Sequence, residues 1–162
     1  MRAKGFTLVE ILIVVVILGI LAAIVIPQFT SASTEAKESA LVSDLQAVRS
    51  QIELYKIQHN DNLPGTIPAG AVVDFVTSMT SKTNQDGVVG TDPALGFRYG
   101  PYMQSLPTNP FNDLNTVELD GTAGDDSAGW NFVTATGATQ GLFQADDSKV
   151  NTLDGDKPHT DY

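Results

Sequence analysis

The chain has 162 residues, enough for one domain, and carries 19 acidic against 9 basic side chains, a formal net charge of −10. More than half of the acidic residues lie from Asp113 onward, so this part should repel nucleic acid and anionic lipid and can attract divalent cations. The absence of cysteine excludes disulfide bonds, and the sequence holds no basic patch or nucleic-acid-binding motif.

Residues 6–26 form the most apolar stretch of the chain. Their one ionisable side chain is Glu10, and all the others are apolar except Thr7 and Gly19. A helix of this length, at ~1.5 Å per residue, reaches roughly 31 Å, close to the hydrocarbon thickness of a bilayer. A carboxylate inside such a helix costs ~2.5–3.5 kcal/mol on insertion scales, so we expect Glu10 to have a function.

Two simple interpretations of residues 6–26 are a secretory signal peptide and a plain membrane anchor. A secretory signal peptide is disfavoured, because the run exceeds an h-region of about 7–15 residues, contains Glu10 and is followed by no polar break. A plain single-span anchor, with Arg2 and Lys4 on the cytoplasmic side, remains open.

Small residues and a proline divide this helix. Gly19 and Ala23 are four residues apart, a spacing that lets helix backbones approach closely in an apolar medium. Pro27 lacks an N–H and its ring clashes with the preceding turn, so we expect the helix to kink or loosen nearby.

Residues 28–59 continue the helix with an amphipathic pattern. Apolar side chains recur in steps of three and four and mark one face, which needs a partner; they are Phe29, Ala32, Ala36, Ala40 or Leu41, Leu45, Val48, Ile52 and Tyr55. The turn-rich segment 59–65 ends the helix.

The following residues, 60–145, predict a small domain of mixed structure. Residues 71–81 have the spacing of a short amphipathic helix. Residues 116–119, 130–134 and 142–144 predict strands of a small antiparallel sheet, the last two joined as a hairpin. A two-stranded hairpin is marginal alone, so we expect the sheet to lie on the apolar face of the helix. Residues 146–162 are polar and acidic and predict a solvated tail.

Enzyme chemistry finds no support in the sequence. His59 and His159 stand in no metal-ligand spacing and beside no nucleophile, so we interpret both as solvated loop residues. The glycines are isolated rather than arranged as a phosphate-binding loop, and there is no Gly-x-Ser-x-Gly elbow. We therefore predict no catalytic site.

The segment Lys4-Gly5-Phe6-Thr7-Leu8-Val9-Glu10, followed by an Ile/Leu/Val run and Pro27, resembles the N-terminus of type IV pilins and type II secretion pseudopilins. The resemblance is specific over residues 2–30, is supported by the architecture to about residue 60, and is loose beyond it. In this family a dedicated membrane peptidase cleaves after the glycine, here Gly5, and N-methylates the new first residue, here Phe6.

This resemblance implies an α+β, type IV pilin-like fold. A long N-terminal helix, with a transmembrane half and an amphipathic half, then packs on a small antiparallel sheet. The segments implied are a cleaved leader at 1–5, a transmembrane and filament-core helix at 6–27, an amphipathic helix at 28–59, a distal α/β domain at 60–145 and an acidic tail at 146–162.

Glu10 gains a role from the resemblance. Cleavage after Gly5 creates an α-amine on Phe6, a cation in an apolar environment. Glu10 cannot neutralise its own amine along a rigid helix and still pack, but the amine of one subunit can meet Glu10 of the next, so that two buried charges compensate each other. The alternative is that Glu10 snorkels to the membrane surface. The resemblance also implies that Gly19 to Pro27 can unwind in an assembled filament.

The function implied is that of a filament subunit, not an enzyme, in a type II secretion pseudopilus or a type IV pilus. The missing disulfide and the acidic loop favour the pseudopilus.

We expect an inner-membrane pool with the distal domain outside the cytoplasm, and a periplasmic or surface filament after assembly. Expected partners are further copies of the chain, the prepilin peptidase and methyltransferase, minor pilins or pseudopilins, the assembly platform and membrane lipid, with no nucleic acid. The alternative is a minor pilin or membrane-anchored binding module, adhesive or receptor-like.

A calcium site is the one cofactor that the residues suggest. Asp120, Asp125 and Asp126 share a loop with Gly121 and Gly124, and hard oxygens on a flexible loop suit calcium. Major pseudopilins, which this chain resembles, bind calcium in this general part of the fold. Further oxygen ligands could come from Asp113, Asp146 and Asp147. The spacing is not that of a helix–loop–helix calcium motif, and a solvated acidic loop is the alternative.

Overall fold

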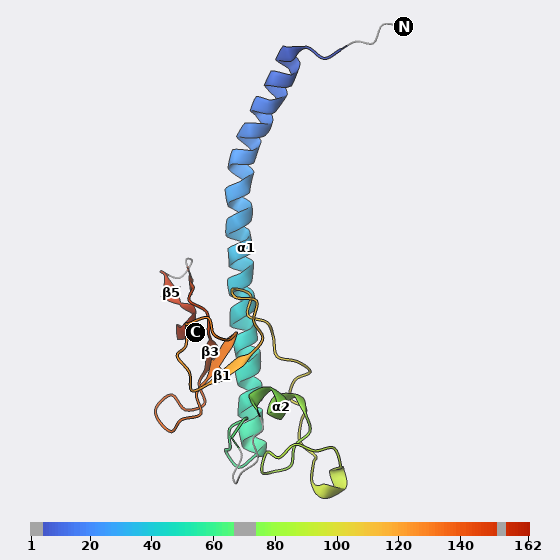
Figure 1. The fold of residues 1–162 in the computed structure, drawn as a ribbon, viewed down its shortest axis with the longest axis vertical. Helices are drawn as coiled ribbons and strands as arrows, with labels where there is room; N and C mark the ends of the chain where they lie inside the picture. Colours follow the sequence, from blue (N-terminus) through green and yellow to red (C-terminus); the bar gives the residue numbers. More distant parts are fainter. Residues whose placement is uncertain (1–4, 67–73, 152–154) are drawn as a thin grey trace. The chain divides into compact units, whose positions relative to one another are not determined.

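The computed structural model describes residues 5–66, 74–151 and 155–162. The chain divides into two compact units, Met1–Lys37 and Glu38–Tyr162, which are described in turn. One helix, α1 (Leu8–Gln58), begins in the first unit and ends in the second (Figure 1).

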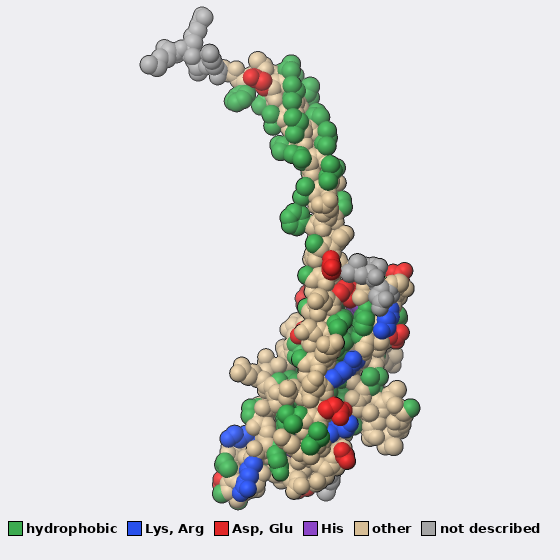
Figure 2. All heavy atoms as spheres, turned by 180° about the vertical axis from the view of Figure 1, so that it is seen from behind, with side chains coloured by type: hydrophobic (Ala, Val, Ile, Leu, Met, Phe, Trp, Pro, Cys, Tyr) green, Lys and Arg blue, Asp and Glu red, His purple; other side chains and the backbone are tan. Residues whose placement is uncertain are grey.

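In the first unit, α1 is apolar and exposed. Hydrophobic side chains cover the visible face of its N-terminal part (Figure 2). Among the described residues, α1 is the one helix long and apolar enough to cross a membrane. The helix runs without a break through Pro27, and the hydroxyls of Thr30 and Ser31 donate to the carbonyls of Ile26 and Pro27, each at 3.2 Å. The loosening expected at the proline therefore does not end the helix.

The second unit is built around the remaining part of α1. Its buried apolar side chains are Leu41, Leu45, Val48, Ile52 and Tyr55. Their spacing of three and four residues is that of the predicted apolar face, although burial begins only at Glu38. Each such side chain contributes about 1.5–3 kcal/mol when fully buried, so this stripe is the main attachment of α1 to the rest of the unit.

A short helix and aromatic side chains complete the core. Helix α2 (Phe75–Thr80) is shorter than the predicted 71–81, of which 71–73 lie outside the described residues. Asp74 caps it by accepting from the N–H of Thr77 at 2.8 Å. Phe75 lies against Phe132, with ring centroids 4.9 Å apart, and joins α2 to the sheet.

The sheet contains β1 (Val117–Leu119), β2 (Trp130–Phe132) and β3 (Phe143–Ala145) in that order. Strands β2 and β3 pair antiparallel, as the predicted hairpin requires. Strands β1 and β2 pair parallel, so the prediction of an entirely antiparallel sheet was wrong. Residues 120–129 carry the chain back to the end of the sheet at which β1 begins. Strand β2 therefore starts at that same end and runs parallel to β1.

The predicted solvated tail is also wrong. Residues 146–162 include β4 (Val150–Asn151), β5 (Lys157–Pro158) and the short 3-10 helix η2 (His159–Asp161); another, η1, spans Pro93–Leu95. Asp146, Asp147, Asn151 and His159 are buried. Asp146, Asp147 and His159 can be buried because they have hydrogen-bond partners on distant segments, which no local sequence pattern reveals. Asn151 donates to the hydroxyl of Tyr162 within the same C-terminal segment.

His59 is buried as well, against the prediction of a solvated histidine. Its ring stacks on Tyr55 with centroids 3.8 Å apart, and both ring nitrogens have partners: the carbonyl of Tyr55 and the hydroxyl of Thr83, each at 2.8 Å. His59 is thus a core residue at the end of α1.

Candidate functional sites: the start of the long helix and the acidic loop

The start of α1 carries a capping box. The hydroxyl of Thr7 accepts from the N–H of Glu10 at 3.3 Å, while Glu10 Oε2 accepts from the N–H of Thr7 at 2.8 Å and from its hydroxyl at 2.7 Å. These bonds satisfy N–H groups that the first helical turn leaves without partners. Sequence reasoning missed this role, although Thr followed three residues later by Glu, ahead of an apolar run, is its usual signal.

The predicted cleavage point lies just before this cap. Gly5 and Phe6 are exposed, and a Cβ placed on Gly5 would meet nothing within 4 Å. The peptide bond between them can therefore be reached without unfolding α1. A Cβ placed on Gly19 also meets nothing within 4 Å, so this face of the helix has room for a close partner.

The three aspartates predicted to hold calcium do not converge on one point. Asp120 Oδ1 accepts from the N–H groups of Thr134 and Ala135 at 2.6 and 2.8 Å, and its other oxygen accepts from the Thr134 hydroxyl. The bonds from Thr134 and Ala135 lower the pKa of Asp120. Asp126 accepts from the N–H of Ser148 at 3.2 Å, and its hydrogen bonds with the side chain and the backbone of Ser148 lower its pKa. Asp120 thus holds the β2–β3 turn, and Asp126 holds the segment after β3.

Asp125 instead meets Glu118 and Asp146. One carboxylate oxygen from each of these three residues lies within 4.8 Å of the others, a separation that one metal ion can bridge. Glu118 comes from β1, Asp125 from the loop before β2, and Asp146 directly follows β3. Sequence reasoning named Asp125 as a ligand and Asp146 as a further contributor, but it missed Glu118, because only the parallel pairing brings β1 to this place.

Asp146 organises the loop around the cluster. This fully buried carboxylate accepts from the N–H of Gly124 at 2.7 Å, of Ala128 at 2.9 Å and of Asp125 at 3.3 Å. The hydroxyl of Ser127 lies 3.2 Å from Asp146 and 2.9 Å from Glu118. Since one hydroxyl has only one proton, it can donate to just one of the two carboxylates.

The sheet supplies a further polar side chain next to the cluster. Asn131 of β2 pairs with Glu118 of β1 and with Gln144 of β3, so the three side chains project from the same face of the sheet. Asn131 is fully buried, and neither its amide oxygen nor its amide nitrogen has a hydrogen-bond partner. A buried amide without a partner costs about 1–3 kcal/mol, so it points to a water or an ion on this face.

Gly121 has a steric reason to be glycine. A Cβ at this position would lie 1.9 Å from Glu118 Oε2, so a larger residue would displace the glutamate. The loop is therefore shaped around the Glu118 side chain.

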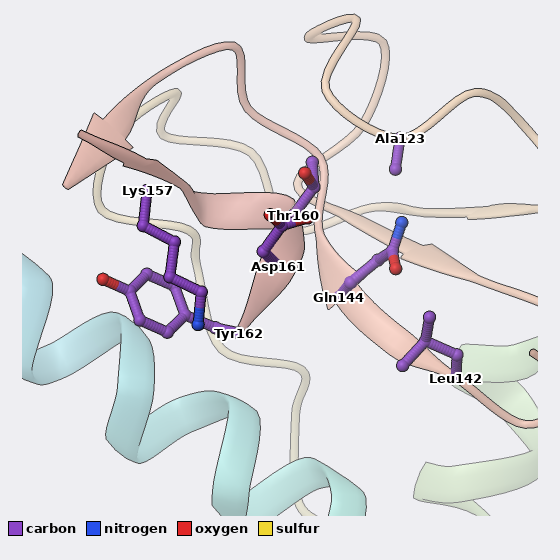
Figure 3. Close-up of a pocket in the computed structure, with 7 residues that line it drawn as sticks. All are labelled: Ala123, Leu142, Gln144, Lys157, Thr160, Asp161 and Tyr162. Carbon is purple, nitrogen blue, oxygen red and sulfur yellow. The ribbon is translucent and has the colours of Figure 1, made fainter. Parts of the chain in front are cut away.

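A separate pocket lies beside the C-terminal residues. It has a volume of about 630 Å³ and is lined by Ala123, Leu142, Gln144, Lys157, Thr160, Asp161 and Tyr162 (Figure 3). Its lining includes none of the three clustered carboxylates, and the Nζ of Lys157 lies 4.4 Å from the centroid of the Tyr162 ring. The three clustered carboxylates therefore do not line this pocket.

Comparison with known proteins supports the interpretation of the N-terminus. The prokaryotic N-terminal methylation motif matches residues 1–26. The type II secretion system core protein G of Aeromonas hydrophila is 30% identical over 151 residues, covering 81% of this chain and 94% of that protein. The same protein of Pseudomonas aeruginosa is 34% identical over 126 residues, covering 76% and 78%. That of Klebsiella pneumoniae is 42% identical over 110 residues, covering 68% and 70%.

No solved structure matches the chain significantly. The coverage of the relatives extends well beyond the N-terminal motif, into the unit that carries the sheet and the acidic loop. The methylation motif, the long apolar helix and these relatives agree: the chain belongs to the type II secretion system core protein G family and is a structural pseudopilin rather than an enzyme.

Proposed function

We propose that this pseudopilin is stored in the inner membrane by residues 6–27 and is assembled into a pseudopilus through an ion pair between the Phe6 amine of one subunit and Glu10 of the next. The observation that supports this proposal is Glu10 itself, the one carboxylate in an apolar, exposed stretch of helix. A charge at this depth is costly unless a partner compensates it.

The capping box gives Glu10 a partner before assembly. In the uncleaved chain, Thr7 donates two hydrogen bonds to Glu10 Oε2, which reduces the cost of the carboxylate. Removal of residues 1–5 turns the nitrogen of Phe6 into an ammonium, the cation that Glu10 of a neighbouring subunit then pairs with. The prepilin peptidase and methyltransferase, minor pseudopilins and the inner-membrane platform act on the chain in this proposal, and residues 38–162 lie on the periplasmic side.

Substitution of Glu10 tests the ion pair. Glu10→Gln retains the size of the side chain but removes its charge, so membrane insertion should be normal while filaments fall at least tenfold. The readout is membrane fractionation together with electron microscopy or shear release of pseudopili. Glu35→Gln, an exposed glutamate on the same helix, serves as the matched control and should assemble normally. Normal filament yield from Glu10→Gln would refute the proposal.

We further propose that Glu118, Asp125 and Asp146 hold a calcium ion, with Asn131 facing the same site. Three carboxylates whose oxygens lie within 4.8 Å repel one another, and the hydroxyl of Ser127 cannot satisfy two of them. Calcium accepts six to eight oxygen ligands in flexible geometry, so carboxylates, a side-chain amide and water would suit it. The sequence also predicted Asp125 as a ligand, whereas Asp120 and Asp126 are not part of the site proposed here.

Thermal unfolding tests the calcium site. A ligand that binds only the native state stabilises it by about 2.7 kcal/mol at one hundred times its dissociation constant. We expect millimolar calcium to raise the Tm of the wild type by several degrees relative to chelator, and Glu118→Gln to lose this shift. Asp86→Asn removes an exposed acidic residue elsewhere and should keep the shift. An equal Tm with calcium and with chelator would exclude the site.

A further inference from the structure

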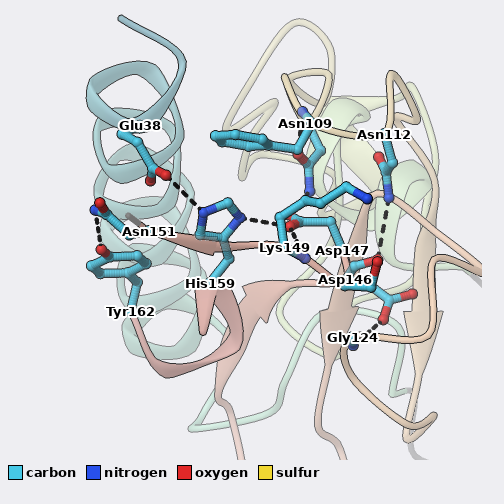
Figure 4. A network of polar contacts seen from close by, with 12 residues as sticks. Glu38, Asn109, Asn112, Gly124, Asp146, Asp147, Lys149, Asn151, His159 and Tyr162 are labelled. Atoms are coloured by element: carbon cyan, nitrogen blue, oxygen red, sulfur yellow. Dashed lines mark hydrogen bonds and ion pairs between the residues drawn. The ribbon is translucent and has the colours of Figure 1, made fainter. Parts of the chain in front are cut away.

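Two adjacent aspartates at the end of β3 serve different clusters. Asp146 accepts from the loop that carries the proposed calcium ligands, as described above. Asp147 is likewise buried, but it accepts from His159 Nδ1 at 2.5 Å and from Asn109 Nδ2 at 2.8 Å (Figure 4). The peptide bond between Asp146 and Asp147 therefore connects the contacts of the loop 120–129 with those of His159, near the end of the chain.

His159 joins this histidine cluster to α1. Its other ring nitrogen, Nε2, lies 2.9 Å from Glu38 Oε1, and both side chains are buried. The ring of Phe111 lies 4.2 Å away, centroid to centroid, and covers the imidazole. Glu38 is the first residue of α1 to be buried, so the Glu38–His159–Asp147 clasp fixes the C-terminal segment where the helix enters the second unit.

Three further contacts join the loop of residues 120–129 to residues 147–160, which follow β3. Asn109 Nδ2 donates both to Asp147 and to the carbonyl of Gly129, at the end of the loop, at 2.9 Å. Ser148 donates to Asp126. Gly124, at a φ of 88°, lies so close to η2 that a Cβ on it would be 3.2 Å from the Thr160 methyl group. The loop cannot shift without disturbing Asp147 or η2.

We propose that cation binding at Glu118, Asp125 and Asp146 and closure of the Glu38–His159–Asp147 clasp are coupled, so that calcium tightens the docking of residues 155–162 on α1. This proposal rests on the proposed calcium site. A cation that draws the three carboxylates together fixes the loop and Asp146, and thereby fixes Asp147 in the position that His159 and Asn109 require. Coupling between two sites is reciprocal, so opening the clasp must weaken calcium binding by the same factor.

The test combines calorimetry and hydrogen exchange on the full chain in detergent micelles. In the wild type, calcium should slow exchange of peptides that contain the amides of His159 and Tyr162, which donate to the carbonyls of Lys149 and His159. Glu38→Gln replaces the carboxyl group of the clasp with an amide and changes no proposed calcium ligand. We expect it to weaken calcium binding about fivefold or more, within the usual range of coupling between sites. Glu35→Gln, one turn earlier and exposed, should leave calcium affinity unchanged.

The outcomes separate the two proposals. If calorimetry detects no calcium binding to the wild type, the calcium site is refuted and the coupling with it. If calcium binds but leaves the exchange of residues 155–162 unchanged, the coupling alone is refuted, and this arm needs no variant. Calcium affinity within twofold of wild type in Glu38→Gln would also overturn the coupling, provided that its Tm shows a folded protein.

Discussion

At the scale of single residues, His59 shows how burial sets a protonation state. Its Nδ1 faces the carbonyl of Tyr55, which can only accept, so this nitrogen carries the proton and Nε2 accepts from the Thr83 hydroxyl. Burial lowers the pKa of His59, since the charged form would lose its hydration. The folded protein therefore resists protonation of a group that the unfolded chain protonates readily.

This difference predicts a loss of stability on mild acidification. The unfolded histidine takes up its proton near pH 6.5, while the folded one does so at lower pH, so the stabilisation is complete above pH ~6.5. Below that pH it falls by up to about 1.4 kcal/mol per pH unit until the folded pKa is reached. Urea unfolding between pH 7.5 and 5.5, followed by the fluorescence of the single Trp130, should show this slope.

His59→Gln provides the comparison, because glutamine retains a polar side chain but does not titrate. The variant should be less stable at pH 7.5, yet it should lose less stability than the wild type between pH 7.5 and 5.5. Other groups titrate in both proteins, so the difference between the two slopes isolates His59. Parallel slopes would contradict the assignment of a lowered pKa.

At the scale of elements, periodicity was informative where one face is apolar and uninformative where polar groups are buried. The steps of three and four from Leu41 to Tyr55 predicted the buried face of α1, because hydrophobic burial acts through local spacing. The parallel pairing of β1 with β2 depends on a loop rather than on the strands, so alternation could not predict it. Asp147 and His159 looked solvated because their partners lie far away in the sequence.

The role of this helical face can be measured with two leucines on α1. Leu45 is 1% exposed in the core, whereas Leu54 is 41% exposed. Leu45→Ala removes buried methyl groups and leaves a cavity, so it should reduce the free energy of unfolding by about 2–5 kcal/mol. Leu54→Ala makes the same chemical change at an exposed site and should cost less than about 1 kcal/mol.

Urea unfolding of both variants in detergent, with Trp130 fluorescence as the probe, measures these costs. Trp130 is fully buried in the same apolar cluster, so its emission reports loss of this core. Equal destabilisation by the two substitutions would mean that the face of α1 turned toward the sheet is not the one described.

At the scale of the whole molecule, the two units differ in how far their features can be predicted from neighbouring residues. The N-terminal motif could be predicted from the sequence because the methylation motif and the apolar span both depend on neighbouring residues within 1–26. The acidic cluster could be read only in part, since its members come from β1, a loop and the end of β3. We therefore expect that a substitution at the proposed cleavage point can block removal of residues 1–5 without affecting the folding of residues 38–162.

Gly5 is the position at which this separation can be tested. Gly5→Val places a branched side chain next to the proposed cleavage point, and we expect the variant to keep its leader while inserting into the membrane and folding normally. Intact mass spectrometry should find wild-type protein beginning at methylated Phe6 and the variant beginning upstream of it. Gly19→Val, at a glycine with equally open surroundings, is the matched control and should be cleaved. Efficient cleavage of Gly5→Val, or wild-type protein that retains residues 1–5 in cells with an active peptidase, would contradict the assignment of Gly5 and Phe6.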